Sequence, residues 1–273
     1  MIYDCFAFFN ELELLEIRLN ELNKVVDRFV LVEATKTFQK KDKPLYFEQN
    51  KERFKPFLHK IEHIVVDEYP NFFTKFRVPK TWDYDNHQKE QIMRGLKNCK
   101  PDDVIIVSDI DEIPKAAKVL EFKDTRDVKI FRQKLYYYYL NCWVYDYEEP
   151  IQTYQDYKPW NGSIMLHFDQ IKTIKETRQY RDSKGPGFKY VEEGGWHYSF
   201  LGGTARVIQK LEAYAHKEHN KDNFKDPAKV EAAIRAGEDL IGRNIKTRFV
   251  DVKTDCPEFV RQNVAQFENL ILK

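Results

Sequence analysis

The sequence predicts an α/β fold: one domain built on a Rossmann-type mixed sheet that is flanked by helices. Its 273 residues suffice for a single large domain of this class. In the first half, apolar β-branched segments alternate with amphipathic helical segments in the order β-α-β-β-α-β. Residues 104–107 (VIIV) are apolar throughout, which is typical of a strand buried on both faces in a parallel sheet.

Residues 1–125 have the pattern of a Rossmann-like half. After the first strand, Asn10 is expected to cap a helix, because Glu13 follows three residues later as in a capping box. Leucines then repeat at helical spacing from Leu12 to Leu22. Pro114 suits the first turn of a later helix, where its missing N–H costs nothing. The predicted strands are 2–9, 28–34, 61–66 and 104–107, and a second helix is predicted at 86–98.

The pattern changes beyond residue 125, where loops are longer and aromatic residues more frequent. Strands of a mixed sheet are predicted at 128–131 and 135–140. Apolar faces at helical spacing predict helices at 204–219 and 227–236. A short final helix is predicted from Pro257 onward.

The composition narrows the class of protein. Lys+Arg 45 against Asp+Glu 44 gives a net charge of +1, which argues against a nucleic-acid partner. Four cysteines are scattered without a C-x-x-C pair, as expected of reduced thiols in a cytosolic setting. The chain has neither a signal-peptide pattern nor a stretch long enough to span a membrane, and peripheral membrane contact is left open.

Asp109 and Asp111 directly follow the buried 104–107 strand. Open α/β sheets bind ligands at the carboxyl ends of their parallel strands. Residues i and i+2 of an extended segment point the same way, so both carboxylates would face one ion. Such a site suits Mg²⁺ or Mn²⁺. Alternatively, these acids only stabilise the N-terminus of the following helix.

A glycine-rich segment, residues 192–203, is the second candidate site. Glycine pairs permit positive φ angles and a close approach of the backbone to a ligand. They flank His197, a candidate third metal ligand, and Trp196, a flat apolar platform. The simpler interpretation is a tight turn with an internally hydrogen-bonded histidine.

Lysine and aromatic side chains complete the set of candidates. Lys210 lies on the helix predicted after the glycine segment and would reach a phosphate group, although a solvated basic helix face has the same spacing. Aromatic residues make up 15% of the chain, and rigid rings bind the apolar face of sugars at low entropic cost. Core packing accounts for part of them. The candidates for sugar binding are Tyr138, Trp143, Trp160 and Trp196.

Taken together, these segments resemble glycosyltransferase family 17. The matching blocks occur in one order between about residues 3 and 217, which is more specific than any single block. They are residues 9–18 (FNELELLEIR), 27–33 (DRFVLVE), 101–114, Lys134 before the tyrosine run, and 195–199 (GWHYS) with the helix after them.

The resemblance implies a GT-A-like fold and the inverting transfer of N-acetylglucosamine from UDP-GlcNAc to a hydroxyl of a glycan or glycoconjugate. Asp111 would hold Mn²⁺ or Mg²⁺ directly, and Asp109 would reach the ribose or a metal-bound water. Residues 1–125 would bind the nucleotide sugar, 126–220 the acceptor with the catalytic groups, and 221–273 would form a C-terminal helical segment. Luminal members begin with a membrane anchor that this N-terminus lacks, so we expect a cytoplasmic enzyme of bacterial or viral type.

Transfer also needs a base for the acceptor and groups that bind the nucleotide. Carboxylates are the candidate bases: Glu193, preferred for its place beside the glycine turn, then Glu192 and Glu112. The candidates for binding the donor are Glu33, Arg94, Asp109, Lys134 and Lys210. Arg94 would otherwise pair with Glu90 four residues away.

Two competing classes keep part of this pattern. A carbohydrate- or nucleotide-sugar-binding protein without turnover would use the aromatic residues but would need neither an Asp-x-Asp pair nor a base. A nucleotidyl- or phosphotransferase would have Thr in an Asp-x-Asp-x-Thr motif, and position 113 is Ile. The sequence therefore favours sugar transfer over both.

Overall fold

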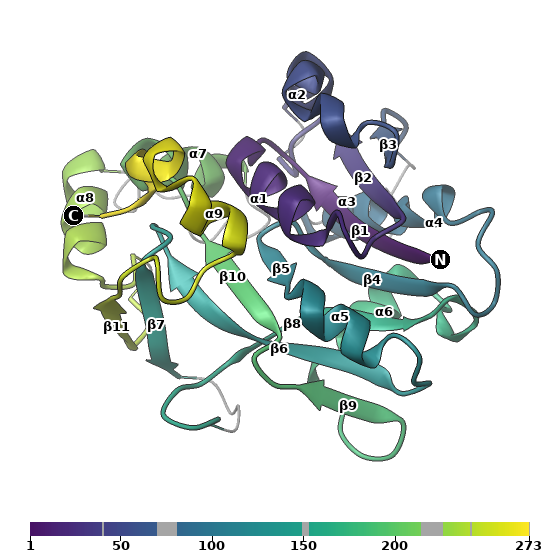
Figure 1. Ribbon diagram of the computed structural model, residues 1–273. Coiled ribbons are helices and arrows are strands. Elements are labelled where there is room, and N and C mark those ends of the chain that lie inside the picture. Colours follow the sequence, from purple (N-terminus) through teal and green to yellow (C-terminus); the bar gives the residue numbers. More distant parts are fainter. Residues whose placement is uncertain (40, 70–80, 149–152, 214–225, 241, 273) are drawn as a thin grey trace, which may run out of the picture.

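In the computed structural model, which describes residues 1–39, 41–69, 81–148, 153–213, 226–240 and 242–272, a large mixed sheet runs through the molecule. Helices flank this sheet (Figure 1), so the predicted fold class is confirmed. The strand order is β11-β7-β6-β8-β4-β1-β2-β3, with β10 paired to β5 and β6, and β9 paired to β6.

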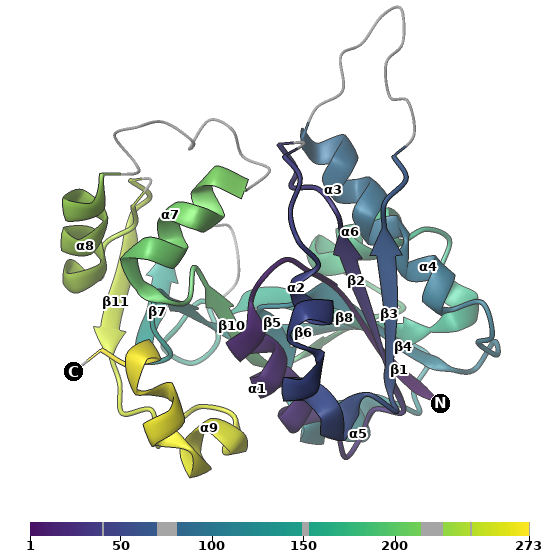
Figure 2. The same ribbon diagram turned by 90° about the horizontal axis from the view of Figure 1, so that it is seen from above.

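Four parallel strands form the N-terminal part of the sheet: β1 (Ile2–Phe8), β2 (Arg28–Ala34), β3 (Ile61–Val66) and β4 (Val104–Asp109). Most of their residues are apolar, because helices cover both faces of this part of the sheet. Helix α1 (Leu12–Leu22) packs on one face, against the cluster with Phe6 and Ile106. Helices α3 (Thr81–Glu90) and α4 (Ile92–Gly95) lie on the other side of these strands (Figure 2).

Three local predictions for this half are wrong. Asn10 does not cap helix α1, which begins at Leu12 with Glu11 at its N-cap. The Glu11 side chain does not cap the helix either, because its carboxylate accepts from the N–H groups of Phe9 and Asn10. Pro114 ends strand β5 (Glu112–Pro114), which pairs with β10, and helix α5 (Ala116–Phe122) starts later. The predicted 86–98 helix is two helices, α3 and α4.

The second half is organised around one long strand, β6 (Val128–Tyr137). It was predicted as two strands because polar residues interrupt its apolar pattern. Its partners explain its continuity: β8 and β9 pair with its first part, and β7 and β10 with its second. The remaining strands are β7 (Cys142–Tyr147), β8 (Trp160–His167), β9 (Phe188–Val191), β10 (Gly195–Ser199) and β11 (Ile245–Phe249).

Short helices complete the chain. The prediction of a helix at 227–236 is confirmed, and the one at 204–219 is confirmed as far as residue 213, because 214–219 lie outside the described residues. The segment 221–273 contains strand β11 as well as helices. The helices are α2 (Tyr46–Gln49), α6 (Ile174–Gln179), α7 (Gly203–Ala213), α8 (Pro227–Ala236) and α9 (Glu258–Gln262), with 3₁₀ helices at Lys51–Phe57, Phe168–Gln170, Tyr180–Asp182 and Val264–Leu270.

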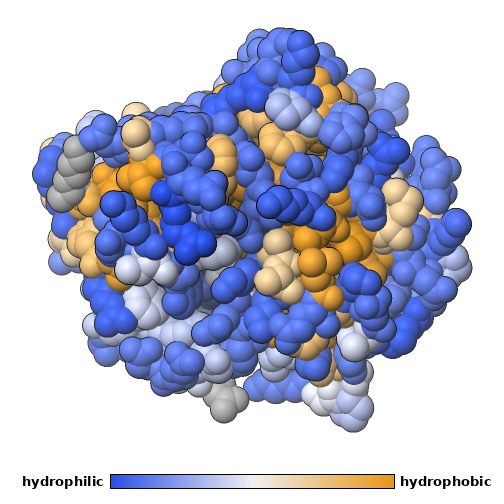
Figure 3. Space-filling view, in the orientation of Figure 1, coloured by the Kyte–Doolittle hydropathy of each residue, from blue (hydrophilic) through white to orange (hydrophobic). Residues whose placement is uncertain are grey.

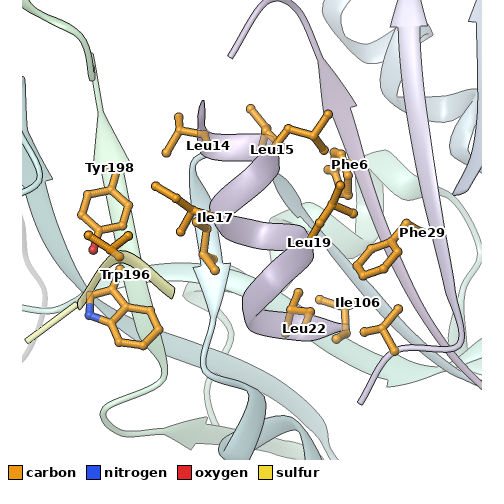
Figure 4. Close-up of a cluster of buried hydrophobic side chains, with 14 of the residues drawn as sticks. Phe6, Leu14, Leu15, Ile17, Leu19, Leu22, Phe29, Ile106, Trp196 and Tyr198 are labelled. Carbon is orange, nitrogen blue, oxygen red and sulfur yellow. The ribbon is translucent and has the colours of Figure 1, made fainter. Parts of the chain in front are cut away.

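Helix α1 joins the two halves through a shared core. In Figure 4, Ile17 lies on the side of α1 toward Trp196 and Tyr198 of β10, while Leu19 lies toward Phe6 and the N-terminal strands. These residues belong to one buried cluster, so both halves pack on the same helix. This packing supports their description as one domain.

The outer surface is predominantly hydrophilic on the face shown in Figure 3, with smaller apolar patches between charged side chains. This agrees with a composition in which 33% of the residues are charged. Within the described part of the chain, every helix is too short or too polar to cross a membrane.

Candidate functional site

The Asp109–Asp111 loop follows β4 and is fixed from beneath by Arg18 of α1. The Arg18 guanidinium is fully buried, and its Nη1 donates to the carbonyl oxygens of Asp109 at 3.0 Å and Glu112 at 2.8 Å. Its Nε and Nη2 donate to the Asp4 carboxylate at 2.7 and 2.6 Å. The inward-facing backbone carbonyls of the loop therefore accept hydrogen bonds from a buried cation, which holds the loop rigidly at the end of the sheet.

Glu112 has a positioning role rather than an open carboxylate. Its side chain is buried, and Oε1 accepts from Trp160 Nε1 at 2.9 Å. Oε2 accepts from Arg181 Nη2 at 2.5 Å and from the N–H of Asp109 at 2.9 Å. With both oxygens engaged, Glu112 orients the indole of Trp160 and the loop, and it is poorly placed to take a proton from an acceptor.

A cleft of about 240 Å³ opens above this loop, at the carboxyl ends of β1 and β4. The side chains that line it include acids, cations and aromatic rings. The acids are Glu11, Asp85, Asp109, Asp111 and Glu112; the cations are Lys36, Lys43, Lys89, Lys210 and Arg243; and the rings include Phe9, Phe38, Tyr137, Trp160, His197 and Phe200.

Asp109 is bound by protein cations. Arg178 of α6 donates to both of its oxygens, at 3.0 and 2.9 Å, and Lys89 of α3 lies 3.1 Å away. Burial by itself raises the pKa of a carboxyl, but Arg178 and then Lys89 outweigh it and hold the pKa of Asp109 well below its usual range. Asp109 is therefore ionised and locked in one orientation.

Asp111 faces the centre of the cleft. Its Oδ2 accepts from Lys210 Nζ at 2.9 Å, and its Oδ1 lies 3.7 Å from His197 Nε2. Burial opposes ionisation here too, but Lys210 and then His197 keep the pKa of Asp111 below its usual range. Trp160 packs on His197 with 4.8 Å between ring centroids, and the buried Nδ1 of His197 has no hydrogen-bond partner among the described residues.

Asp111 and His197 fit a divalent cation, whereas Asp109 does not. Ligand atoms lie about 2.1 Å from such an ion, so two ligands of one ion are at most about 4.2 Å apart; the 3.7 Å between Oδ1 and Nε2 meets this condition. Both Asp109 oxygens are engaged by Arg178. In the described part of the chain, no three His, Cys, Asp or Glu side chains converge on one metal position. Substrate oxygens and water would complete the coordination, as is usual for Mg²⁺. The metal assignments stay predictions.

Alternation along β6 and β10 separates the candidates for substrate binding. Leu135 and Tyr137 of β6 and His197 of β10 line the cleft. Their neighbours Lys134 and Trp196 point to the opposite face of the sheet, because successive strand residues alternate. There Lys134 and Trp196 both bind Asp255, the indole Nε1 at 3.0 Å.

Trp143 and Tyr138 also lie away from the cleft lining. Trp143 packs on Tyr157 at 5.5 Å between centroids, within the buried cluster behind the sheet. The Tyr138 hydroxyl donates to the carbonyl of Glu238 at 3.0 Å and accepts from the N–H of Leu240 at 3.1 Å. Tyr138 thus anchors the C-terminal segment. Of the four residues predicted to bind sugar, Trp160 lines the cleft.

Glu33 and Arg94, two candidates for nucleotide binding, interact with other parts of the protein and lie outside the cleft lining. Glu33 is fully buried beneath α2, where it accepts from Lys43 Nζ and the N–H of Phe47 at 3.3 Å and lies 3.1 Å from His63 Nε2. Arg94 is exposed and donates to the carbonyl of Val65 at 2.9 Å. Neither residue lines the cleft.

The candidate bases Glu192 and Glu193 lie on the turn between β9 and β10, outside the cleft lining. Glu192 pairs with Arg132 at 2.5 Å, and Glu193 is exposed with a φ of 51°. The glycine at position 195 is required by strand pairing, because a Cβ there would lie 2.1 Å from the carbonyl oxygen of Ile113. This close approach lets β10 pair with β5.

The cations that hold the acids were hard to identify from the sequence. Arg178 of α6 and Arg181 of the following 3₁₀ helix lie three residues apart, but nothing local shows that they face Asp109 and Glu112 about 70 residues earlier. Arg18 lies within a leucine-rich helical stripe, where an isolated arginine is an unusual core residue. Its place in that stripe was the signal available from the sequence.

Folding stability should depend on pH through the Asp109–Arg178 pair. An aspartate in an unfolded chain titrates at about pH 3.9. The pKa of Asp109 in the folded protein lies well below this value. The stabilisation is therefore complete above about pH 5 and is lost as the pH falls below about 4 toward the folded pKa. Urea unfolding of the wild type and of Asp109→Asn should differ equally at about pH 7 and 5, and this difference should shrink steadily as the pH falls below about 4. A difference that stays constant down to the lowest pH would contradict this account.

The sheet and the cleft define a class, an α/β protein whose acids and cations meet at the carboxyl ends of parallel strands. The family model described as glycosyltransferase family 17 matches residues 1–247, and the chain belongs to this family, as its resemblance predicted. Membership places it among the glycosyltransferases.

Part of this chain is similar in sequence to relatives named beta-1,4-mannosyl-glycoprotein 4-beta-N-acetylglucosaminyltransferase. Those from Homo sapiens and Rattus norvegicus are each 32% identical over 120 residues, which is 42% of this chain and 22% of the relative. The relative from Mus musculus is 31% identical over 120 residues, again 42% of this chain and 22% of the relative. The matched stretch thus spans about a fifth of these longer proteins.

Among solved structures, the chain is similar to a 4-diphosphocytidyl-2C-methyl-D-erythritol synthase, with a TM-score of 0.38 and 10% identity, covering 71% of this chain and 88% of the other. It is also similar to the inositol-1-phosphate CTP transferase from T. maritima, with a TM-score of 0.33 and 12% identity, covering 100% and 97%. These likenesses are weak, and the fold is defined by the sheet described above.

Proposed function

We propose that this protein transfers a sugar from a nucleoside-diphosphate sugar to a hydroxyl of a glycan or glycoconjugate, with inversion and with a divalent cation. UDP-GlcNAc is the proposed donor, since the relatives are named as N-acetylglucosaminyltransferases. The observation that carries the proposal is the convergence of Asp111, His197 and Lys210 in one cleft at the carboxyl ends of β1 and β4.

The charges of the cleft suit the departure of a diphosphate. Breaking the donor's sugar–phosphate bond places negative charge on the leaving nucleotide. Asp111 and His197 would hold Mn²⁺ or Mg²⁺, which when bound supplies a Lewis acid for that charge. Lys210 and Lys89, which also line the cleft, would bind phosphate oxygens. Trp160 would offer its ring to the sugar from a position fixed by Glu112.

A carboxylate in the cleft would accept the proton of the acceptor hydroxyl as it attacks the anomeric carbon from the side opposite the leaving group. Glu192 and Glu193 lie outside the cleft lining, and both oxygens of Glu112 are engaged. Glu11 and Asp85 do line it. Asp85 is paired with Lys89 at 2.9 Å, whereas the hydrogen bonds that Glu11 accepts from the N–H groups of Phe9 and Asn10 both go to its Oε2. The geometry therefore favours Glu11 over the three bases predicted from the sequence.

The competing function is binding of a nucleotide sugar without turnover, which the same cleft would permit. The test is release of the nucleoside diphosphate from each donor, UDP from UDP-GlcNAc and UDP-glucose and GDP from GDP-mannose, with Mn²⁺ and with EDTA, together with Mn²⁺-dependent thermal stabilisation by each nucleotide sugar. With UDP-GlcNAc we expect Mn²⁺-dependent release of UDP and Mn²⁺-dependent stabilisation. Glu11→Gln should lower the rate of release and leave the stabilisation unchanged. Stabilisation without release of UDP to water or to any glycan acceptor would favour the binding protein.

A further inference from the structure

Lys210 donates a hydrogen bond to Asp111, the carboxylate that would bind the proposed divalent cation. Its Nζ is 2.9 Å from Oδ2 of Asp111, and the Asp111 side chain is only 9% exposed. A buried carboxylate without a counter-ion is strongly unfavourable, so Lys210 neutralises it in the empty cleft. Two cations on one carboxylate repel each other, which means that a divalent ion and the Lys210 ammonium compete for Asp111.

The Lys210 side chain has a second direction in which to lie. It lines both the cleft and a smaller neighbouring cavity, which Glu11 and Glu13 also line. The side chain is 25% exposed, and its four-carbon stem is flexible. It can therefore leave Asp111 without a displacement of α7, and a diphosphate in the cleft would offer it new oxygens.

We infer that Lys210 is an exchangeable counter-ion, which neutralises Asp111 while the cleft is empty and moves to the donor's diphosphate when a divalent cation takes Asp111. The inference rests on the proposed function. It makes metal and nucleotide binding cooperative, because the nucleotide binds the ammonium that the metal displaces. Such coupling is reciprocal: each ligand raises the affinity for the other by the same factor.

The experiment measures Mn²⁺ binding to the full chain by electron paramagnetic resonance of the free ion, with and without UDP. In the wild type we expect UDP to raise the Mn²⁺ affinity by about tenfold or more. Lys210→Met should bind Mn²⁺ alone about tenfold more tightly, since its competitor is gone. UDP should then raise that affinity by a smaller factor than in the wild type, because only its direct contacts with Mn²⁺ still couple the two ligands. These readouts need no turnover.

Matched variants identify the cause. Arg206→Met removes a cation from the same helix that pairs with Glu13 rather than Asp111, and its Mn²⁺ affinity should equal the wild type. Lys210→Arg keeps the charge and should not bind Mn²⁺ more tightly, which tests the idea even where the Met variant is unstable. Equal or weaker Mn²⁺ binding by Lys210→Met would overturn the inference. The expected Mn²⁺ shifts without turnover of any nucleotide sugar would support it and overturn the proposed function instead.

Discussion

Replacing Arg18 with methionine should lower the free energy of unfolding by about 3–5 kcal/mol, the usual cost of removing one partner of a buried ion pair. Arg18 and Asp4 are fully buried, and the guanidinium also donates to the carbonyls of Asp109 and Glu112. The variant leaves a buried carboxylate without a counter-ion and buried carbonyls without donors. Domains have about 5–15 kcal/mol of stability, so this is a large fraction of the total. Urea unfolding followed by circular dichroism measures it.

Two further variants separate the ion pair from the loop. Arg53→Met removes an arginine with partly exposed partners and should cost less than about 1 kcal/mol. Combining Asp4→Leu with Arg18→Met removes the orphaned carboxylate but not the orphaned carbonyls, so it should restore only part of the loss. Full recovery would show that Arg18 does not support the Asp109–Asp111 loop, and an Arg18→Met cost below about 1 kcal/mol would contradict the whole account.

The parallel strands were predictable because helices cover both faces of the sheet and most strand residues are therefore apolar. The predictions for Arg28–Ala34 and Ile61–Val66 agree with the structure residue for residue. Pro114 shows the limit of local signals: it is as compatible with the end of a strand as with the start of a helix, and the distant strand β10 decides between them. Long-range pairing of this kind leaves no local pattern.

Asp109, Asp111 and Glu112 of the cleft were predictable, but its other acids, Glu11 and Asp85, and the face of the sheet that lines it were not. Trp196 and His197 are neighbours in β10, and strand alternation sends one behind the sheet and the other into the cleft. Both faces carry aromatic residues, so composition did not distinguish them. A one-residue difference in register therefore decides which of the predicted ligands share a site.

The environments of the two aspartates predict different roles for them in catalysis. Asp111 lies between Lys210 and His197, where an ion would bind, whereas Asp109 is held by Arg178. Asp111→Asn removes the charge that would fix the metal. We therefore expect kcat/KM for UDP-GlcNAc to fall by about a thousandfold, in line with the loss of a main electrostatic group, and the response to Mn²⁺ to disappear.

Asp109→Asn is the matched control, with the same chemical change two residues away. It weakens the bidentate contact with Arg178 but leaves Asp111 and His197 in place. Its kcat/KM should fall by about tenfold, as for a group that orients ligands rather than binds the ion, and activity should still rise with Mn²⁺. Steady-state kinetics across a Mn²⁺ titration compares the two. If Asp111→Asn kept its Mn²⁺ response while Asp109→Asn lost it, the metal would belong to Asp109, and the ion pair with Arg178 would have to open during each turnover.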